Sequence, residues 1–276
     1  MEEKLYMQRF NFITFNIHSD ADLFVDMAKY VSKKNRTIVA IQEKPKKEVI
    51  EQIEKMNDVS LITDLNNRLA FIIPKSLNII SKKNAKKDMP NLLERRTLEM
   101  DLPLQDGVVK IVNVHGFSKQ DNGDEKNRDL FSKINETYEN CPKKIVLGDF
   151  NTNPYELNMT LETRIYADRD FESVVNSKKD VLYNPSWRYL RERKKFKGTH
   201  YYGSCIPRWH FYDQILISKS LVGSATGTGA SRMYTNYVKL FHIVDRLGNR
   251  VFKPSESYDK DKHISDHMPV LLTLEI

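Results

Sequence analysis

The chain has 276 residues, of which 40% are hydrophobic, so it is long and apolar enough to bury a large core. No Pro-, Gly- or Ser-rich linker divides it, and we therefore expect one domain over residues 1–276. Its formal net charge of +7, from 44 Lys+Arg against 37 Asp+Glu, favours polyanionic partners such as nucleic acid, anionic lipid headgroups or phosphate esters.

The two cysteines, Cys141 and Cys205, lack any metal-type spacing, which argues against a zinc site or a disulfide framework. Two free thiols fit a reducing compartment, so we expect a cytoplasmic protein. The first residues lead into a mixed segment and not into an apolar run, so we expect no signal peptide. No stretch of about 18 apolar residues occurs, so we expect no membrane span. The oligomeric state stays open, with a monomer as the default.

The first third of the chain alternates between strand and helix patterns. Residues 10–17 are aromatic and β-branched and predict a strand that delivers Asn16 near its end. A second buried strand over 37–41 ends in Gln42 and Glu43. The other elements predicted here are a helix from Ser19 or Asp20 to about residue 34, a helix over about 46–56, and strands around 59–63, 69–73 and 77–80.

The rest of the chain continues this alternation, which predicts an α/β layered fold. Around its middle, the apolar residues 145–147 predict a short buried strand. Two further strands carry a polar residue near one end: 108–114, which is followed by His115, and 211–218, which contains Asp213. The remaining predictions are strands over 95–102 and 270–274, a helix that includes 130–138, a helix over 156–165, and a hairpin within 234–252.

Asp149 and Asn151 follow the central strand two positions apart. Gly148 lets the backbone turn there without a Cβ in the way. Asp149 can hold a water or a metal, and Asn151 supplies an uncharged donor that can face an oxyanion. A carboxylate and a donor on one turn suit attack on a phosphate, where charge develops on the equatorial oxygens. An ordinary Asx turn after a strand would explain the same residues, so the turn alone leaves both interpretations open.

Polar residues stand at six predicted strand ends, and each has an ordinary structural explanation when taken alone. Taken together, these residue types suit metal-assisted hydrolysis of a phosphate ester. Glu43 and Asn16 offer hard oxygen ligands that suit magnesium. His267 is a candidate general base or proton-sharing group, and Asp213 could fix its tautomer. The other candidates are Asp149, which would orient the attacking water, and Asn151 and His115, which would meet phosphate oxygens.

These strand ends resemble the endonuclease/exonuclease/phosphatase superfamily, which has the fold of DNase I and exonuclease III. The matching segments occur in the family's order and span nearly the whole chain. They are 14–17, 41–43, 112–115, 147–151, 212–216 and 265–267, of which Gly-Asp-Phe-Asn and Ser-Asp-His are the most specific. The resemblance implies a four-layer α/β sandwich with two central mixed β-sheets flanked by helices. It also implies hydrolysis of a phosphate ester with Mg²⁺ or Mn²⁺.

The resemblance assigns a role to each matched residue. It implies that Glu43 binds the metal, with Asn16 and Asp266 close by. It also implies that Asp213 pairs with His267 and that Asp149 orients the attacking water. Asn151 is expected to bind phosphate, and His115 occupies the second-histidine position of DNase I-like members. Either Arg95 or Arg96 can match the family's phosphate-contacting arginine, and we take Arg95 as the expected contact. His18 departs from the pattern, since many members have Arg there.

The segment 187–197 mixes cations with aromatic side chains, which suits a nucleic-acid backbone together with base stacking. We therefore expect DNA or RNA as the substrate, with Arg191, Arg193 and Lys195 as contacts. An exposed basic helix face is the other interpretation of this segment. Two alternative functions remain: a phosphatase for a nucleotide, an inositol phosphate or another small phosphomonoester, and a non-catalytic nucleic-acid-binding module.

Overall fold

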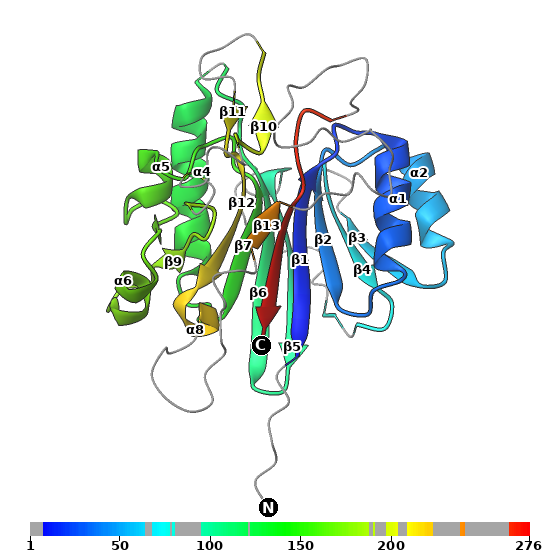
Figure 1. Ribbon diagram of the computed structural model, residues 1–276, viewed down its shortest axis with the longest axis horizontal. Coiled ribbons are helices and arrows are strands. Elements are labelled where there is room, and N and C mark those ends of the chain that lie inside the picture. Colours follow the sequence, from blue (N-terminus) through cyan, green and yellow to red (C-terminus); the bar gives the residue numbers. More distant parts are fainter. Residues whose placement is uncertain are drawn as a thin grey trace, which may run out of the picture.

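The computed structural model describes residues 8–63, 68–77, 79–80, 95–120, 122–187, 190, 197–203, 209–222, 238–240 and 265–276. Over these residues two six-stranded mixed sheets lie face to face, and helices cover their outer faces (Figure 1). The predicted four-layer α/β sandwich is therefore confirmed. The largest group of buried apolar residues fills the space between the sheets, and includes Phe12, Phe71, Ile111 and Ile145.

The first sheet has the strand order β13-β14-β1-β2-β4-β3. β1 and β2 are parallel, so both point their carboxyl ends toward the same edge, and the other neighbours are antiparallel. The strands are β1 (Arg9–Asn16), β2 (Thr37–Gln42), β3 (Val59–Thr63), β4 (Leu69–Pro74), β13 (Val238–Leu240) and β14 (Val270–Glu275).

The second sheet has the order β5-β6-β7-β12-β9-β8, and a separate ribbon pairs β10 with β11. β6 and β7 are parallel, whereas β12 runs antiparallel to β7. The strands are β5 (Thr97–Leu104), β6 (Gly107–His115), β7 (Lys144–Asp149), β8 (Ala167–Asp168), β9 (Leu182–Tyr183), β10 (His200–Tyr201), β11 (Trp209–His210) and β12 (Asp213–Ser218).

The helices bury one apolar face each against a sheet. In α1 (Ala21–Val31), Asp20 caps the first turn by accepting a hydrogen bond from the Leu23 amide at 2.7 Å. α1 and α2 (Lys47–Glu54) cover the first sheet, and α4 (Gly123–Tyr138) covers the second (Figure 1). The shorter helices are α5 (Leu157–Thr160), α6 (Phe171–Asn176) and α8 (Lys219–Val222). None of the helices in the described ranges is both long and apolar enough to span a bilayer.

Asn113 of β6 links the two sheets through the core. Its amide donates to the carbonyls of Ile41 (3.0 Å) and Ala70 (3.2 Å), and its Oδ1 accepts from Gln42 Nε2 at 2.7 Å. Asn113 and Gln42 are both fully buried. Because β2 and β6 carry site residues at their ends, this bridge fixes the relative position of the two halves of the site.

Two predicted elements differ from the structure. The helix expected over 156–165 is a single turn, Leu157–Thr160, because only Met159 is buried on it. Glu156 turns back to accept from Asn153 N (3.0 Å) and Nδ2 (2.7 Å). The strand expected near 77–80 is reduced to one bridge between Ile80 and Asp101. Of the hairpin predicted within 234–252, only Val238–Leu240 lies in the described residues.

Candidate active site

The strand registers bring the predicted residues to one edge of the sandwich. Asn16 ends β1 beside Gln42, and Glu43 follows directly. In the second sheet, Asp149 at the end of β7 is paired with His115 on one side and with Asp213 on the other. Since rigid strand ends carry these side chains, the sheets fix their spacing.

Asp149 lies at the centre of this edge and is almost fully buried. Its Oδ2 accepts from Asn16 Nδ2 (3.1 Å) and Asn151 Nδ2 (3.2 Å), and its Oδ1 accepts from the Asn151 amide (2.9 Å). His115 Nε2 and His267 Nε2 both lie 3.7 Å from Oδ2. Burial alone would raise the pKa of Asp149, but the neighbouring positive charge of His267 is the main influence that lowers it, so the carboxylate is ionised.

Asp213 and His267 form a buried pair, with 2.9 Å between Asp213 Oδ2 and His267 Nδ1. Burial alone would lower the pKa of His267, but Asp213 and Asp149 outweigh it and raise that pKa to about 10. Burial raises the pKa of Asp213, and the charge on His267 limits the rise. At neutral pH the ring is therefore an imidazolium whose Nε2–H faces Asp149. Of the two roles predicted for His267, proton sharing fits this charge state better than general base.

Glu43 lies beside Asn16, whose Nδ2 donates to Glu43 Oε1 at 3.3 Å. Arg68 Nη2 donates to the other oxygen at 3.1 Å, and His115 Nε2 is 3.9 Å from Oε1. Glu43 has a φ of 55°, in the left-handed region, and Asn151 has a φ of 49°. Non-glycine residues in this region are strained, and such residues cluster at functional sites.

Gly148 allows the close approach of β6 and β7 behind the site. Its φ is 154°, and a Cβ added there would lie 1.9 Å from the Val114 carbonyl oxygen. The glycine predicted to ease the turn is thus also required for the pairing that aligns His115 with Asp149.

Glu43 and Asp266 fit a hard divalent cation. Both carboxylates remain partly open to solvent, at 18% and 28% of the side chain, and Mg²⁺ needs only one or two carboxylates because it keeps several waters. Asn16 presents its amide nitrogen to the carboxylates, since its Oδ1 accepts from the His18 amide at 3.0 Å. In this arrangement Asn16 holds Glu43 and Asp149 together.

Arg96 lies next to the site. Its guanidinium packs 4.0 Å from the centre of the Phe117 ring and donates to the Gly116 carbonyl at 3.3 Å. Burial and the nearby Arg68 lower the pKa of Arg96. Arg95, the arginine we chose from the sequence, is exposed. The other expected substrate contacts, Arg191, Arg193 and Lys195, lie outside the described residues.

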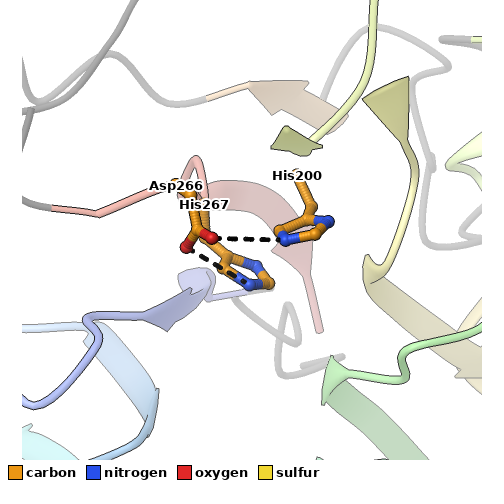
Figure 2. A group of neighbouring side chains, drawn as sticks. All are labelled: His200, Asp266 and His267. Atoms are coloured by element: carbon orange, nitrogen blue, oxygen red, sulfur yellow. Dashed lines mark ion pairs between the residues drawn. The ribbon is translucent and has the colours of Figure 1, made fainter. Parts of the chain in front are cut away.

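His200 is a site residue that the sequence did not reveal. Figure 2 shows its ring pointing toward Asp266 and His267. His200 Nε2 lies 3.4 Å from Asp266 Oδ2, and the two imidazole rings are 4.4 Å apart. Burial alone would raise the pKa of Asp266, but its hydrogen bond with His200 and the charge of His267 hold that pKa well below its usual range. His200 is brought to the site by an isolated β-bridge between His200 and His267, and no local sequence pattern predicts such a bridge.

No family model matches the chain, and no curated protein matches its sequence. Solved structures do match its fold. D. rerio TDP2 complexed with single strand DNA product has a TM-score of 0.60 at 14% identity, with 98% of this chain and 100% of that chain covered. An endonuclease/exonuclease/phosphatase from Bacteroides vulgatus has a TM-score of 0.54 at 12% identity, with 98% and 99% covered.

The endonuclease domain of TRAS1, a telomere-specific non-LTR retrotransposon, also matches, with a TM-score of 0.50 at 12% identity and coverage of 97% and 99%. At these identities the likeness shows the fold. The chain has the DNase I-like fold of the endonuclease/exonuclease/phosphatase proteins, over nearly its full length.

Proposed function

We propose that the protein is a divalent-metal-dependent phosphoesterase that hydrolyses phosphodiester bonds in nucleic acid. The observation that carries this proposal is the meeting of the Asp213–His267 pair with Asp149, at 2.9 Å and 3.7 Å, on the same edge as Glu43. A charged donor, an ionised acceptor and a hard oxygen ligand together meet the needs of metal-assisted attack by water on phosphorus.

Each side chain has a distinct task in this mechanism. Asp149 accepts a hydrogen bond from the attacking water and orients it. His267, held by Asp213, donates its Nε2–H to a phosphoryl oxygen and stabilises the charge that develops there. Burial lowers the pKa of His115 despite the neighbouring Asp149, so we assign it as a neutral donor. A cation bound by Glu43 and Asp266 would neutralise charge on the phosphate.

Nucleic acid is the proposed substrate because three separate observations favour a polyanion with bases. The net charge is +7, and the segment 187–197 mixes cations with aromatic residues. Among proteins of the same fold, D. rerio TDP2 is complexed with single strand DNA product.

A substrate panel tests the proposal. Single- and double-stranded DNA, RNA, a nitrophenyl phosphodiester and soluble phosphomonoesters are incubated with Mg²⁺ or Mn²⁺, beside the variant Asp149→Asn. We expect cleavage of a nucleic acid by the parent and a loss of at least about 10²-fold in the variant. Release of phosphate from a monoester alone would favour the phosphatase. Binding of nucleic acid without turnover of any substrate would favour the non-catalytic module.

Glu43→Gln tests the metal. We expect activity to disappear in excess EDTA and to return with Mg²⁺. The variant should need a much higher Mg²⁺ concentration for half-maximal rate, because a neutral amide is a poorer ligand than a carboxylate. Glu48→Gln, on the exposed face of α2, is the matched control and should behave as the parent. Full activity in EDTA would contradict the metal requirement.

A further inference from the structure

His200 has no role in the proposed phosphoesterase chemistry, yet it converges with Asp266 and His267 on one point. One nitrogen or oxygen from each lies within 4.8 Å of the others. Figure 2 shows the Asp266 carboxylate facing both rings, and its oxygens lie 3.4 Å from His200 Nε2 and 3.9 Å from His267 Nε2. Two imidazoles and a carboxylate form a ligand set of a different class from the oxygens of Glu43 and its neighbours.

Backbone pairing holds this group in place. Tyr201 N donates to the Asp266 carbonyl at 3.0 Å, and Met268 N donates to the Thr199 carbonyl at 2.7 Å. The ring of His200 stacks on Tyr212, with 5.2 Å between centres and 19° between planes. The ligands are therefore carried by β10 and by the segment 266–268 that is hydrogen-bonded to it.

The orientation of His267 suits metal coordination as well. Asp213 occupies Nδ1, so Nε2 is the atom presented toward Asp266. A carboxylate on the far nitrogen is the usual support of a metal-bound histidine, because it fixes the tautomer and raises ligand basicity. The side chain of Asp266 is 28% exposed, whereas those of His200 and His267 are 12% and 7% exposed, so an ion can approach from the Asp266 side.

We propose that His200, Asp266 and His267 form a site for a nitrogen-preferring divalent ion of the zinc class, which shares Asp266 with the proposed magnesium site but takes its other ligands from the two histidines. Ligand atoms in a tetrahedral zinc site are about 3.4 Å apart, so the observed spacings need to close by no more than roughly 1.4 Å. Mg²⁺ is not expected here, because it prefers oxygen ligands in octahedral geometry. A coordinated ion takes the Nε2 lone pair of His267 and sends the Nε2 proton to solvent.

This occupancy has a consequence that rests on the proposed function. The ion removes the donor that His267 would offer to phosphate, so Zn²⁺ should inhibit Mg²⁺-dependent hydrolysis. Binding itself does not depend on that function, and the two are measured separately.

The binding experiment uses the whole chain with Co²⁺ or Zn²⁺ as the only metal. Calorimetry with Zn²⁺ and visible absorption with Co²⁺ should both show one site, with Co²⁺ bands typical of low coordination. His200→Phe keeps a stacked ring but lacks the nitrogen, and should weaken Zn²⁺ binding by at least about tenfold. His210→Phe, in the same ribbon but outside the ligand group, is the control and should bind Zn²⁺ as the parent does.

The inhibition experiment compares rates with and without Zn²⁺ for each variant at saturating Mg²⁺. The parent and His210→Phe should be inhibited, and His200→Phe should need at least about tenfold more Zn²⁺ for the same fractional loss of rate.

Should His200→Phe fail to fold, His200→Gln takes its place, and the Co²⁺ spectrum of the parent still tests whether the site binds metal. Absence of Co²⁺ and Zn²⁺ binding by the parent, or equal affinity in the His200 variants, overturns the proposal. Zn²⁺ binding without inhibition would support the metal site but would overturn the proposed effect of Zn²⁺ on hydrolysis.

Discussion

His267 holds its proton because three carboxylates surround it. Its pKa of about 10 in the folded chain exceeds the ordinary 6.5, so protonation stabilises the fold. That contribution is complete below about pH 6.5 and disappears as the pH rises through about 10. We expect the free energy of unfolding of the metal-free protein to fall over this interval by up to a few kcal/mol, measured by urea denaturation. His267→Gln should lack this slope, and the same slope in both proteins would contradict the assignment.

Because Asp213 contacts His267 Nδ1 at 2.9 Å, we expect Asp213 to act on the reaction only through that ring. Asp213→Asn and His267→Gln should each lower kcat by roughly 10²–10⁴-fold. The double variant should be scarcely slower than His267→Gln alone, because residues that act as one unit are not additive. Independent roles would instead give losses that multiply. Single-turnover kinetics on a nucleic-acid substrate distinguishes the two results.

Asn113 is the polar link between elements of the two sheets. Asn113→Ala leaves the Ile41 and Ala70 carbonyls without their donor in a dry core, and each buried unsatisfied group costs about 1–3 kcal/mol. We expect the free energy of unfolding to fall by about 2–5 kcal/mol, with activity reduced because the two halves of the site are no longer held in register. Asn135→Ala removes an exposed hydrogen bond to the Glu162 carbonyl and should change stability by about 0.5 kcal/mol or less.

Elements with a strong local pattern were predictable from the sequence. α1 repeats its buried residues at helical spacing and begins at the predicted cap Asp20. The strand ends at Asn16 and Asp149 also agree, because buried apolar runs that stop at a polar residue mark where a strand leaves the core. That these residues share one site was expected from the polar residues at successive strand ends and from the resemblance to the endonuclease/exonuclease/phosphatase superfamily.

Contacts made by short or distant elements were not predictable. β10 has two residues and no alternation to read, so His200 gave no sign that it would meet Asp266. The choice between Arg95 and Arg96 depended on a packing partner, Phe117, that lies on another segment. The helix expected over 156–165 is a single turn, since Leu157 and Leu161 are exposed and give it no continuous apolar face.

The charge of the whole molecule sets how its affinity for nucleic acid should depend on salt. Cations that contact phosphates release counterions, so the logarithm of the binding constant should fall linearly with the logarithm of salt concentration. Replacing Arg191, Arg193 and Lys195 together with Ala should reduce the slope by about one unit for each phosphate that is no longer neutralised. Turnover of a small nitrophenyl diester should persist, because those residues are not among the candidate metal or water-orienting groups.

The control for this experiment changes the same number of charges elsewhere. Lys29, Lys33 and Lys34 are exposed around the end of α1, the opposite end from Asp20 and the site. Their replacement should lower overall attraction slightly and leave the slope close to that of the parent. Equal slopes for the two triple variants would show that the basic segment is an ordinary solvated surface.

The position of β14 has a consequence for biosynthesis. β14 lies between β13 and β1, and its residue Thr273 contacts Asn11 of β1, 262 positions earlier. At ribosomal rates of about 5–20 residues per second, β1 is made roughly 10–50 s before the strand that covers it. Throughout that interval one side of β1 is an open template for other strands. The nascent chain therefore exposes the β1 edge to pairing with other chains, whereas the folded protein covers it with β14.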